Sequence, residues 1–247
     1  MPHNVTRRSV VAQLGALTSL IGMARSRSAF AGSIGRETER LVSRIDTLSG
    51  ALRGELIPVN DWRNGINELL SSVPVAELMQ GLDFERLAAR TGFADLGVST
   101  ATIDFGFNEK KRLNFLPKLF AVDTGRSIIP HGHSNMVSAH LPLAGAFRLR
   151  QYDQISRNEH SLTIRPTVDR RITSGDLSSI GEEDDNVHWF IAEESSYTFD
   201  VIITGLDDQE KRPYEIYNLD ILAAKANPDG SLTAPRMEVA EALKKYG

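Results

Sequence analysis

The residues with the clearest capacity for chemistry are histidines. His131 and His133 stand two positions apart in the sequence. On a β-strand, positions i and i+2 point to the same face, so both imidazoles could face one interior. Two neutral imidazoles suit Fe(II), zinc, copper or nickel, but at least one more ligand is needed. The chain contains no cysteine, so that ligand has to be another histidine, an aspartate or a glutamate.

The residues around this pair carry further spacing information. Gly125 lies six positions before the first histidine, and Gly145 lies twelve positions after the second. This pattern resembles the first motif of the cupin superfamily, in which a glutamate also follows the second histidine. Here the place of the glutamate is held by Val137 or Ser138. The resemblance implies a mainly β fold with a cupin barrel, the double-stranded β-helix or jelly roll.

A second cupin motif on a later strand is expected to supply the third ligand. Within Val187–Phe190, His188 and Phe190 would share one face of a strand. Because the glutamate is missing, the sequence predicts a metal centre that consists of three histidines, His131, His133 and His188.

Four short segments narrow the resemblance. They are Ile129-Pro130-His131-x-His133-x-x-Met136, Tyr152-Asp153, Asn186-Val187-His188-x-Phe190 and Phe199-Asp200-Val201-Ile202. Together they are similar to the thiol dioxygenase family of plant cysteine oxidases and animal cysteamine dioxygenase, over roughly residues 115–205. The resemblance implies Fe(2+) held by three histidines, with O2 and a small thiol as substrates and a sulfinic acid as the product.

Three departures from that family concern the substrate. Gly132 stands where an acidic residue is usual, the loop before His188 is acidic, and 204–207 lacks the family's Gly-Pro-Pro-Tyr. Two alternatives therefore stay open. One is another three-histidine cupin oxygenase that acts on a carbon substrate, such as a diketone- or flavonol-cleaving type. The other is a non-catalytic cupin that binds a metal or a small ligand.

Two further residues near the motifs invite a functional interpretation. Tyr152 is a candidate proton donor or neighbour of the ligands, and the alternative is a packing role on an amphipathic strand. His140 follows His133 by seven positions. On one continuous strand, an odd separation places two side chains on opposite faces, so we expect His140 not to bind the metal.

The remaining candidates have a simple structural interpretation. Arg148 and Arg150 alternate with apolar residues; one could bind a substrate carboxylate, but both could equally lie on a solvated sheet face. Asp200 is expected to support the barrel, Trp189 to pack, and His160 to lie in a turn. The acidic run 182–185 is expected to be a solvated loop.

Residues 34–92 predict the helices of the chain. Apolar residues recur at spacings of three and four from Leu41 to Leu56, with charges between them. A second helix is predicted after Asn60-Asp61, a short one near Val75–Met79, and another from Asp83 that stops at Gly92.

From about residue 98 the pattern changes to short strands separated by glycines and charged turns, which favours an antiparallel barrel or sandwich. We expect four parts: an export signal (1–31), a helical segment (32–96), the barrel (97–222) and a tail with a surface helix (223–247). The expected strands are 102–105, 115–122, 127–130, 136–143, 146–152, 161–164, 187–192, 198–204 and 214–219, and the expected final helix is 235–246.

The first 31 residues resemble a twin-arginine (Tat) export signal. Arg7-Arg8 precedes a moderately apolar stretch, Val10–Ala24, and Ala29-Phe30-Ala31 resembles a cleavage site. The stretch is too short to span a membrane comfortably, so no membrane span is expected in the mature protein. The resemblance implies recognition by the Tat machinery and a periplasmic or otherwise exported location, reached after folding and metal loading.

Charge excludes one class of partner. The formal net charge is −4, but residues 1–31 carry four arginines and no acid, so the rest of the chain has a net charge of −8. A net-acidic body argues against broad electrostatic binding to nucleic acid or to anionic membranes. With 41% hydrophobic residues, the chain can form one sizeable core.

Overall fold

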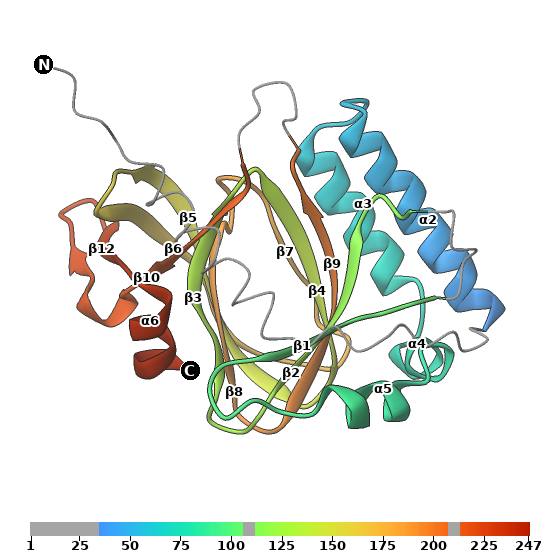
Figure 1. Cartoon of the computed structure of the whole chain (residues 1–247). Helices are drawn as coiled ribbons and strands as arrows, with labels where there is room; N and C mark the ends of the chain where they lie inside the picture. The colour runs from blue at the N-terminus through green and yellow to red at the C-terminus, as the bar shows by residue number, and fades with distance from the viewer. Residues whose placement is uncertain (1–34, 106–111, 207–212) are drawn as a thin grey trace, which may run out of the picture.

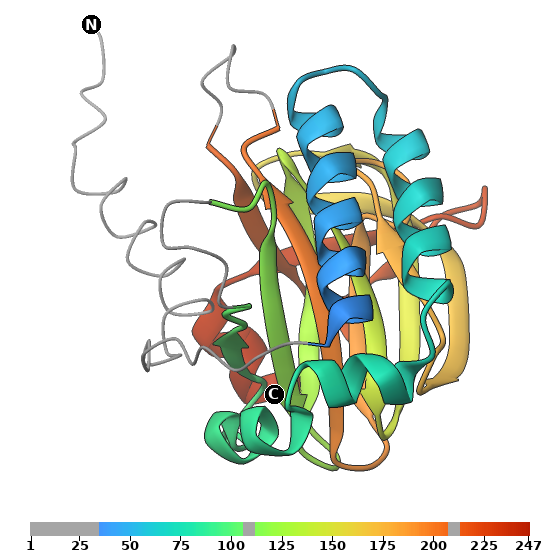
Figure 2. The ribbon, with the colours of Figure 1, turned by 90° about the vertical axis from the view of Figure 1, so that its right-hand side faces the viewer.

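Two antiparallel sheets form the body of the molecule, and N-terminal helices cover the outer face of one of them (Figures 1 and 2). The computed structural model describes residues 35–105, 112–206 and 213–247. The fold is mainly β with an α-helical N-terminal part, as the sequence predicts. The predicted export signal lies outside the described residues.

The N-terminal helices bury one apolar face each. The first two lie side by side against the smaller sheet, with Leu41 and Ile45 of the first and Trp62 and Ile66 of the second in the core. This burial is what stabilises them, because isolated helices of this length are marginal in water. The helices are α2 (Arg36–Arg53), α3 (Val59–Ser71), α4 (Val75–Gly81) and α5 (Phe84–Thr91).

Two helix boundaries differ from the prediction. α2 ends at Arg53, so Leu56 lies beyond it and is 79% exposed. α3 begins at Val59 after Pro58, which lies at the N-cap, so Asn60 does not cap the helix. The apolar periodicity located both helices but not their ends, because it continues past a helix that a glycine or proline terminates.

The smaller sheet has five strands in the order β1-β2-β9-β4-β7. Its central strands alternate strictly. Val137, Ala139 and Leu141 of β4 pack on the helices, so Ser138 and His140 face the larger sheet. The strands are β1 (Ser99–Thr102), β2 (Leu116–Val122), β9 (Ser196–Thr204), β4 (Met136–Ala144) and β7 (Ser178–Ile180).

The larger sheet has seven strands in the order β10-β3-β8-β5-β6-β12-β11, and β10 also pairs with β12. The pairings do not by themselves define a single closed barrel. The strands are β10 (Glu215–Leu219), β3 (Ser127–Ser134), β8 (Val187–Ala192), β5 (Ala146–Arg157), β6 (Ser161–Thr173), β12 (Leu232–Met237) and β11 (Lys225–Ala226).

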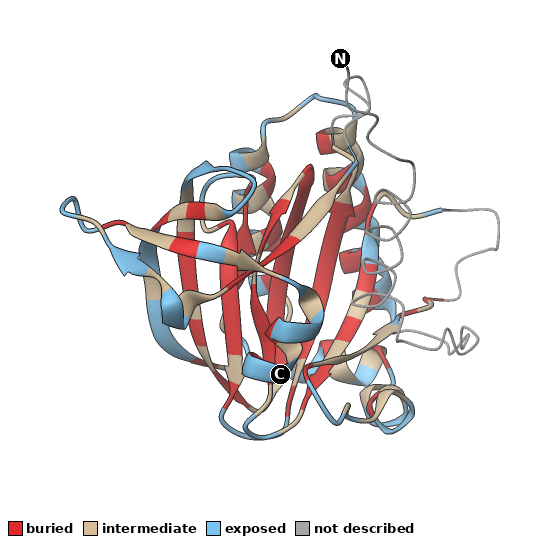
Figure 3. Cartoon of the chain, turned by 60° about the vertical axis from the view of Figure 1, so that its left-hand side comes forward, coloured by how far each residue is buried: buried red, intermediate tan, exposed pale blue. Residues whose placement is uncertain are grey.

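Apolar side chains fill part of the space between the sheets. Ile128, Phe147, Leu149 and Phe190 of the larger sheet pack with Val122 of the smaller one. Figure 3 shows the result as continuous buried stretches along the central strands. This cluster forms an apolar floor next to the histidines, since Leu149 and Phe190 adjoin the row that contains His188.

Several strands were missed or misplaced from the sequence, and the first, expected at 102–105, is β1 at Ser99–Thr102. β6 continues to Thr173 although its second half is mostly exposed and contains Pro166, because a register shift lets it follow β5 past the proline. β7 has only three residues. β12 lies within the expected tail 223–247 but pairs with β6 and β10, so the larger sheet extends into that segment. The final helix, α6 (Val239–Tyr246), therefore begins four residues after the expected start at Pro235.

Candidate metal centre

The three predicted ligands lie together on two neighbouring strands of the larger sheet. His131 of β3 pairs directly with His188 of β8, and residues opposite each other in an antiparallel pair share a face. One ring nitrogen from each of His131, His133 and His188 lies within 4.8 Å of the others. Metal–nitrogen bonds of about 2 Å place ligand nitrogens about 3 Å apart, so small side-chain rotations bring all three to one ion.

A β-bulge in β3 creates this arrangement. Between Ile128 and His131 the register with β8 shifts by one residue, because three steps along β3 match two along β8. Ile128 and His131 therefore both face inward, although an odd separation would otherwise place them on opposite faces. Pro130 lies in the bulge, where a missing backbone N–H costs little.

Hydrogen bonding fixes the tautomer of His131. Its Nδ1 lies 2.7 Å from the carbonyl oxygen of Ile129. A carbonyl can only accept, so Nδ1 carries the proton and Nε2 keeps the lone pair that a metal would use. Burial lowers the pKa of His131 to about 4, so the ring is neutral near pH 7.

The other two rings fit the same role. His133 and His188 are almost fully buried, and within the described part of the chain neither Nδ1 has a hydrogen-bond partner. Burial lowers the pKa of both residues well below the usual imidazole value, and neighbouring histidines lower it further. Three neutral imidazoles with uncommitted nitrogens are the donor set that Fe(II), zinc or copper accepts, so these residues fit a divalent transition metal.

A buried asparagine ties the two ligand strands together. Asn186, two residues before His188, accepts from the His133 N–H at 3.0 Å and donates to the His133 carbonyl at 3.0 Å. The Tyr217 hydroxyl lies 2.7 Å from that same carbonyl oxygen. We call Asn186 and Tyr217 the His133 clamp. Such supporting contacts hold ligands in the orientation that a metal requires.

The His133 clamp also explains one departure from the thiol dioxygenase pattern. A Cβ atom at Gly132 would collide with the Tyr217 ring and lie 2.8 Å from Asn186 Oδ1. An acidic side chain therefore does not fit between the two histidines here. In the sequence, Asn186 stands out only as part of the resemblance, and its role is not predictable because its partners are distant along the chain.

The expectation that His140 faces away from the ligands is wrong. Its ring centroid lies 5.1 Å from that of His188. β3 ends at Ser134 and β4 begins at Met136, with Asn135 between them at a positive φ of 57°, so alternation does not continue from one strand to the next. Only one continuous strand from His133 to His140 would have placed the two side chains on opposite faces.

His140 nevertheless has no nitrogen to offer a metal. Its Nδ1 lies 2.8 Å from Asp200 Oδ2, and its Nε2 lies 2.9 Å from Ser138 Oγ. Asp200 is completely buried and supports the fold through this contact, as expected. Ser138, at one of the two possible places of the missing glutamate, points to the same side as His140 and binds it.

Tyr152 does not lie with the histidines. It pairs with Val187, the neighbour of His188, and therefore occupies the opposite face of the sheet. There it packs with Leu162 and Ile164. Burial raises its pKa. The packing interpretation of Tyr152 holds, and the catalytic one has no support from this geometry.

The other candidates occupy structural positions. Arg148 and Arg150 form an ion-pair ladder with Asp169 on the exposed sheet face, and Arg150 also lies over the Trp189 ring. Trp189 packs against Tyr246 of α6, and His160 lies in an exposed turn. None of these residues faces the histidines.

The acidic run is only partly the solvated loop that was expected. Asp185 accepts from Arg63 of α3 at 2.6 Å and from Thr167 at 2.7 Å. Glu182 accepts from the backbone N–H of Asn135, in the turn after β3, at 3.0 Å. The loop thus joins the N-terminal helices to the strand that carries His188.

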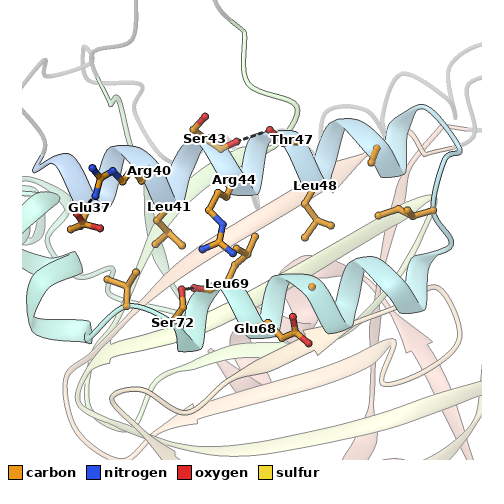
Figure 4. Close-up of a pocket in the computed structure, with 14 residues that line it drawn as sticks. Glu37, Arg40, Leu41, Ser43, Arg44, Thr47, Leu48, Glu68, Leu69 and Ser72 are labelled. Atoms are coloured by element: carbon orange, nitrogen blue, oxygen red, sulfur yellow. Dashed lines mark hydrogen bonds and ion pairs between the residues drawn. The ribbon is translucent and has the colours of Figure 1, made fainter.

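A groove between α2 and α3 is separate from this centre (Figure 4). It is lined by both helices and by the turns that follow them, and it includes none of the candidate site residues. No helix in the described ranges has the length and apolar character needed to cross a membrane.

Comparisons with known proteins do not assign a family. No family model matches the sequence, and no curated protein matches it significantly. Solved structures similar to part of the chain include TT1209 from Thermus thermophilus, at 15% identity, 49% of this chain, 94% of that chain and a TM-score of 0.35. KdgF from Halomonas sp. is 17% identical over 47% of this chain and 90% of that chain, with a TM-score of 0.32. The vicilin from Solanum melongena is 16% identical over 53% of this chain and 33% of that chain, with a TM-score of 0.37. At these scores the similarities identify no activity.

Proposed function

We propose that this chain is a metal-binding cupin that oxidises a small thiol with O2 to a sulfinic acid, at an iron(II) centre held by His131, His133 and His188. The observation that supports the proposal is the convergence of three neutral imidazoles with no carboxylate among them in the described part of the chain. The sequence resemblance to thiol dioxygenases supplies the reaction.

The neutral ligand set is what distinguishes this chemistry from that of the two-histidine, one-carboxylate oxygenases. A bound Fe(II) ion would keep its full positive charge, favour the thiolate over the thiol, and supply the redox chemistry of RSH + O2 → RSO2H. Both oxygen atoms and all electrons are accounted for by the thiol and O2, so no further reductant is needed.

The protein's own residues would supply position and environment. His131 is held by its bond to Ile129, and His133 by the His133 clamp. The apolar floor of Phe147, Leu149 and Phe190 excludes water from one side of the centre. Pre-oriented ligands and a dry wall reduce the reorganisation that bringing two reactants together requires.

Export is a separate part of the proposal. Residues 1–31 would direct the folded protein through the Tat pathway, so that the metal is selected in the cytoplasm before transfer to the periplasm. This order matters because a bare nitrogen site prefers copper or zinc to iron by the Irving–Williams series. N-terminal sequencing of the exported protein tests it: the expected start is near Gly32, and a start at Met1 contradicts cleavage.

Oxygen uptake by iron-reconstituted protein tests the reaction. The protein is loaded with Fe(II) without oxygen and then mixed with O2 and a panel of small thiols. The expected result is stoichiometric uptake and a product that has gained two oxygen atoms by mass spectrometry. Uptake with a diketone or flavonol instead favours the carbon-substrate alternative, and failure to bind any metal contradicts the metal centre itself.

A further inference from the structure

Unpaired polar atoms are concentrated between the two sheets. In the part of the chain that the structure describes, eleven buried side-chain nitrogen or oxygen atoms have no hydrogen-bond partner. Seven of them belong to residues on the facing sides of the sheets, whereas buried polar atoms are normally paired throughout a protein. These seven residues are His133, Gln151, Ser178, His188, Thr198, Asp200 and Asn218.

The strand register places two of these residues in line with the metal ligands. Gln151 of β5 pairs with His188, and Asn218 of β10 pairs with His131. Directly paired residues share a face, so the inward side of the larger sheet presents the row Asn218, His131, His188 and Gln151 across four adjacent strands. Each ligand of the row thus has a buried amide as its outer neighbour.

Gln151 is an unexpected residue at its position. Its side chain is only 4% exposed, and its Nε2 has no partner among the described residues. The next inward residue on β5 is Leu149, which packs in the apolar floor. An apolar side chain would suit this environment better, because a buried donor without an acceptor destabilises a fold. A ligand that accepts from Nε2 would account for the amide.

We propose that Gln151 positions the substrate by donating a hydrogen bond from Nε2 to its carboxylate, and so selects small thiol acids over aminothiols. This inference rests on the proposed thiol chemistry. Nε2–H donates, so a carboxylate oxygen can accept from it, whereas an ammonium group offers this N–H no acceptor. Adjacent strands lie about 5 Å apart, which matches a thiolate at the centre with a carboxylate one or two carbons away.

Binding to cobalt-loaded protein tests the proposal without relying on turnover. Co(II) replaces iron in full-length protein without oxygen, and absorption spectra report each titration. The probes are mercaptoacetate, 2-aminoethanethiol, which lacks the carboxylate, and glycolate, which lacks the sulfur. The variants are Gln151→Leu and Gln151→Glu. Asn67→Leu is the matched control, because Asn67 also has a buried unpaired oxygen but lies on α3.

Gln151→Leu is expected to lower the affinity for mercaptoacetate about tenfold to a hundredfold, which is the usual contribution of a hydrogen bond to a charged group. Gln151→Glu should weaken it further, because two carboxylates then face each other. The affinity of Gln151→Leu for 2-aminoethanethiol should change less than about twofold. Asn67→Leu should leave the affinity for both thiols unchanged.

A thermal scan of the ligand-free variants separates a ligand-binding amide from a structural one. If Gln151 is held in place for a ligand, Gln151→Leu removes an unpaired buried group and raises the Tm of the protein by about 2 °C or more. If Gln151 supports the fold, the same substitution lowers the Tm, and the proposal is overturned.

The remaining outcomes distinguish this inference from the proposed function. If Gln151→Leu binds mercaptoacetate as tightly as wild type, or loses affinity for both thiols equally, the proposed contact of Gln151 with the carboxylate is wrong, while thiol binding at the centre stands. If only glycolate binds, and does so through Gln151, the carboxylate contact stands and the thiol chemistry fails. If no probe or no cobalt binds, both are overturned.

Discussion

The two sheets present histidines to the same interior, and the two sets differ in what their nitrogens already do. On the smaller sheet, both nitrogens of His140 are engaged, by Asp200 and by Ser138. On the larger sheet, the Nδ1 atoms of His133 and His188 have no hydrogen-bond partner among the described residues, and the hydrogen bond of His131 to Ile129 engages its Nδ1. All four rings are largely shielded from solvent and lie close together.

The difference shows that burial and proximity do not identify a metal ligand. A histidine that is bonded at both nitrogens is a structural element, because binding a metal would break a buried hydrogen bond. A buried histidine nitrogen without a protein partner is unfavourable for folding until water, a metal or another ligand binds it. Protein groups therefore engage both nitrogens of His140 on the smaller sheet, whereas the histidines of the larger sheet keep nitrogens that a metal could bind.

Loss of a ligand on the larger sheet should have the largest effect. His188→Ala is expected to weaken metal binding by far more than the 10- to 100-fold that loss of a merely supporting residue causes. The measurement is metal content by elemental analysis after iron reconstitution, with circular dichroism to show that the sheets remain folded. A His188→Ala protein that retains one equivalent of metal contradicts the assignment of the centre.

Loss of the structural histidine on the smaller sheet should reverse this pattern. His140→Ala leaves Asp200 buried without its partner, which should lower the free energy of unfolding by about 3 kcal/mol or more. Metal content should stay near one equivalent. Urea unfolding of the apo-protein measures the first quantity and elemental analysis the second. His140→Ala with native stability and no metal would show that the two sheets have been assigned the wrong roles.

Loss of the His133 clamp should lower metal affinity by an intermediate amount. Asn186→Ala removes both contacts with the His133 backbone, and the expected loss of metal affinity is about 10- to 100-fold, the range for residues that orient a ligand. Competition with a metal chelator measures the affinity. Asn227→Ala is the control, because Asn227 bonds to Ser231 and Thr233 at the far edge of the sheet and should leave the affinity unchanged.

The sequence predicts a large part of this site because the residues that reveal it lie close together along the chain. His131 and His133 share a strand, and the missing glutamate can be read directly at Val137 or Ser138. The helices were found from periodicity alone, since Leu41 and Ile45 repeat with the period of the face they bury. Each of these features depends on residues within one element.

What the sequence could not provide depends on how strands are paired. The bulge before His131, the inward direction of His140 and the position of Gln151 beside His188 all follow from register, which brings together residues that are far apart along the chain. The turn at Asn135 breaks the alternation by a single residue, and a one-residue change moves every later side chain to the other face.

A smaller effect is expected where the helices meet the ligand strand. Arg63→Met removes the bonds from α3 to Asp185 and to the carbonyl of Ser179, and both ion-pair partners are mostly shielded from solvent. We expect a loss of about 1–2 kcal/mol in unfolding free energy, with metal affinity unchanged. Unfolding in urea checks the first part. A loss of metal from Arg63→Met would show that the helices orient His188 as well as covering the sheet.

The smallest effect is expected on the outer face of the larger sheet. Arg148 pairs with Asp169, but both side chains are more than 40% exposed, so solvent screens the pair and Arg148→Ala should leave the urea midpoint of unfolding unchanged. The substitution should also leave mercaptoacetate binding unchanged, because Arg148 pairs with Ile191 and Arg171, on the face opposite to His188. Weaker binding in Arg148→Ala would restore this arginine as a carboxylate ligand and would mean that the substrate approaches from outside the sheets. Unchanged binding, beside a loss in Gln151→Leu, would place carboxylate recognition on the same inward row as the metal ligands.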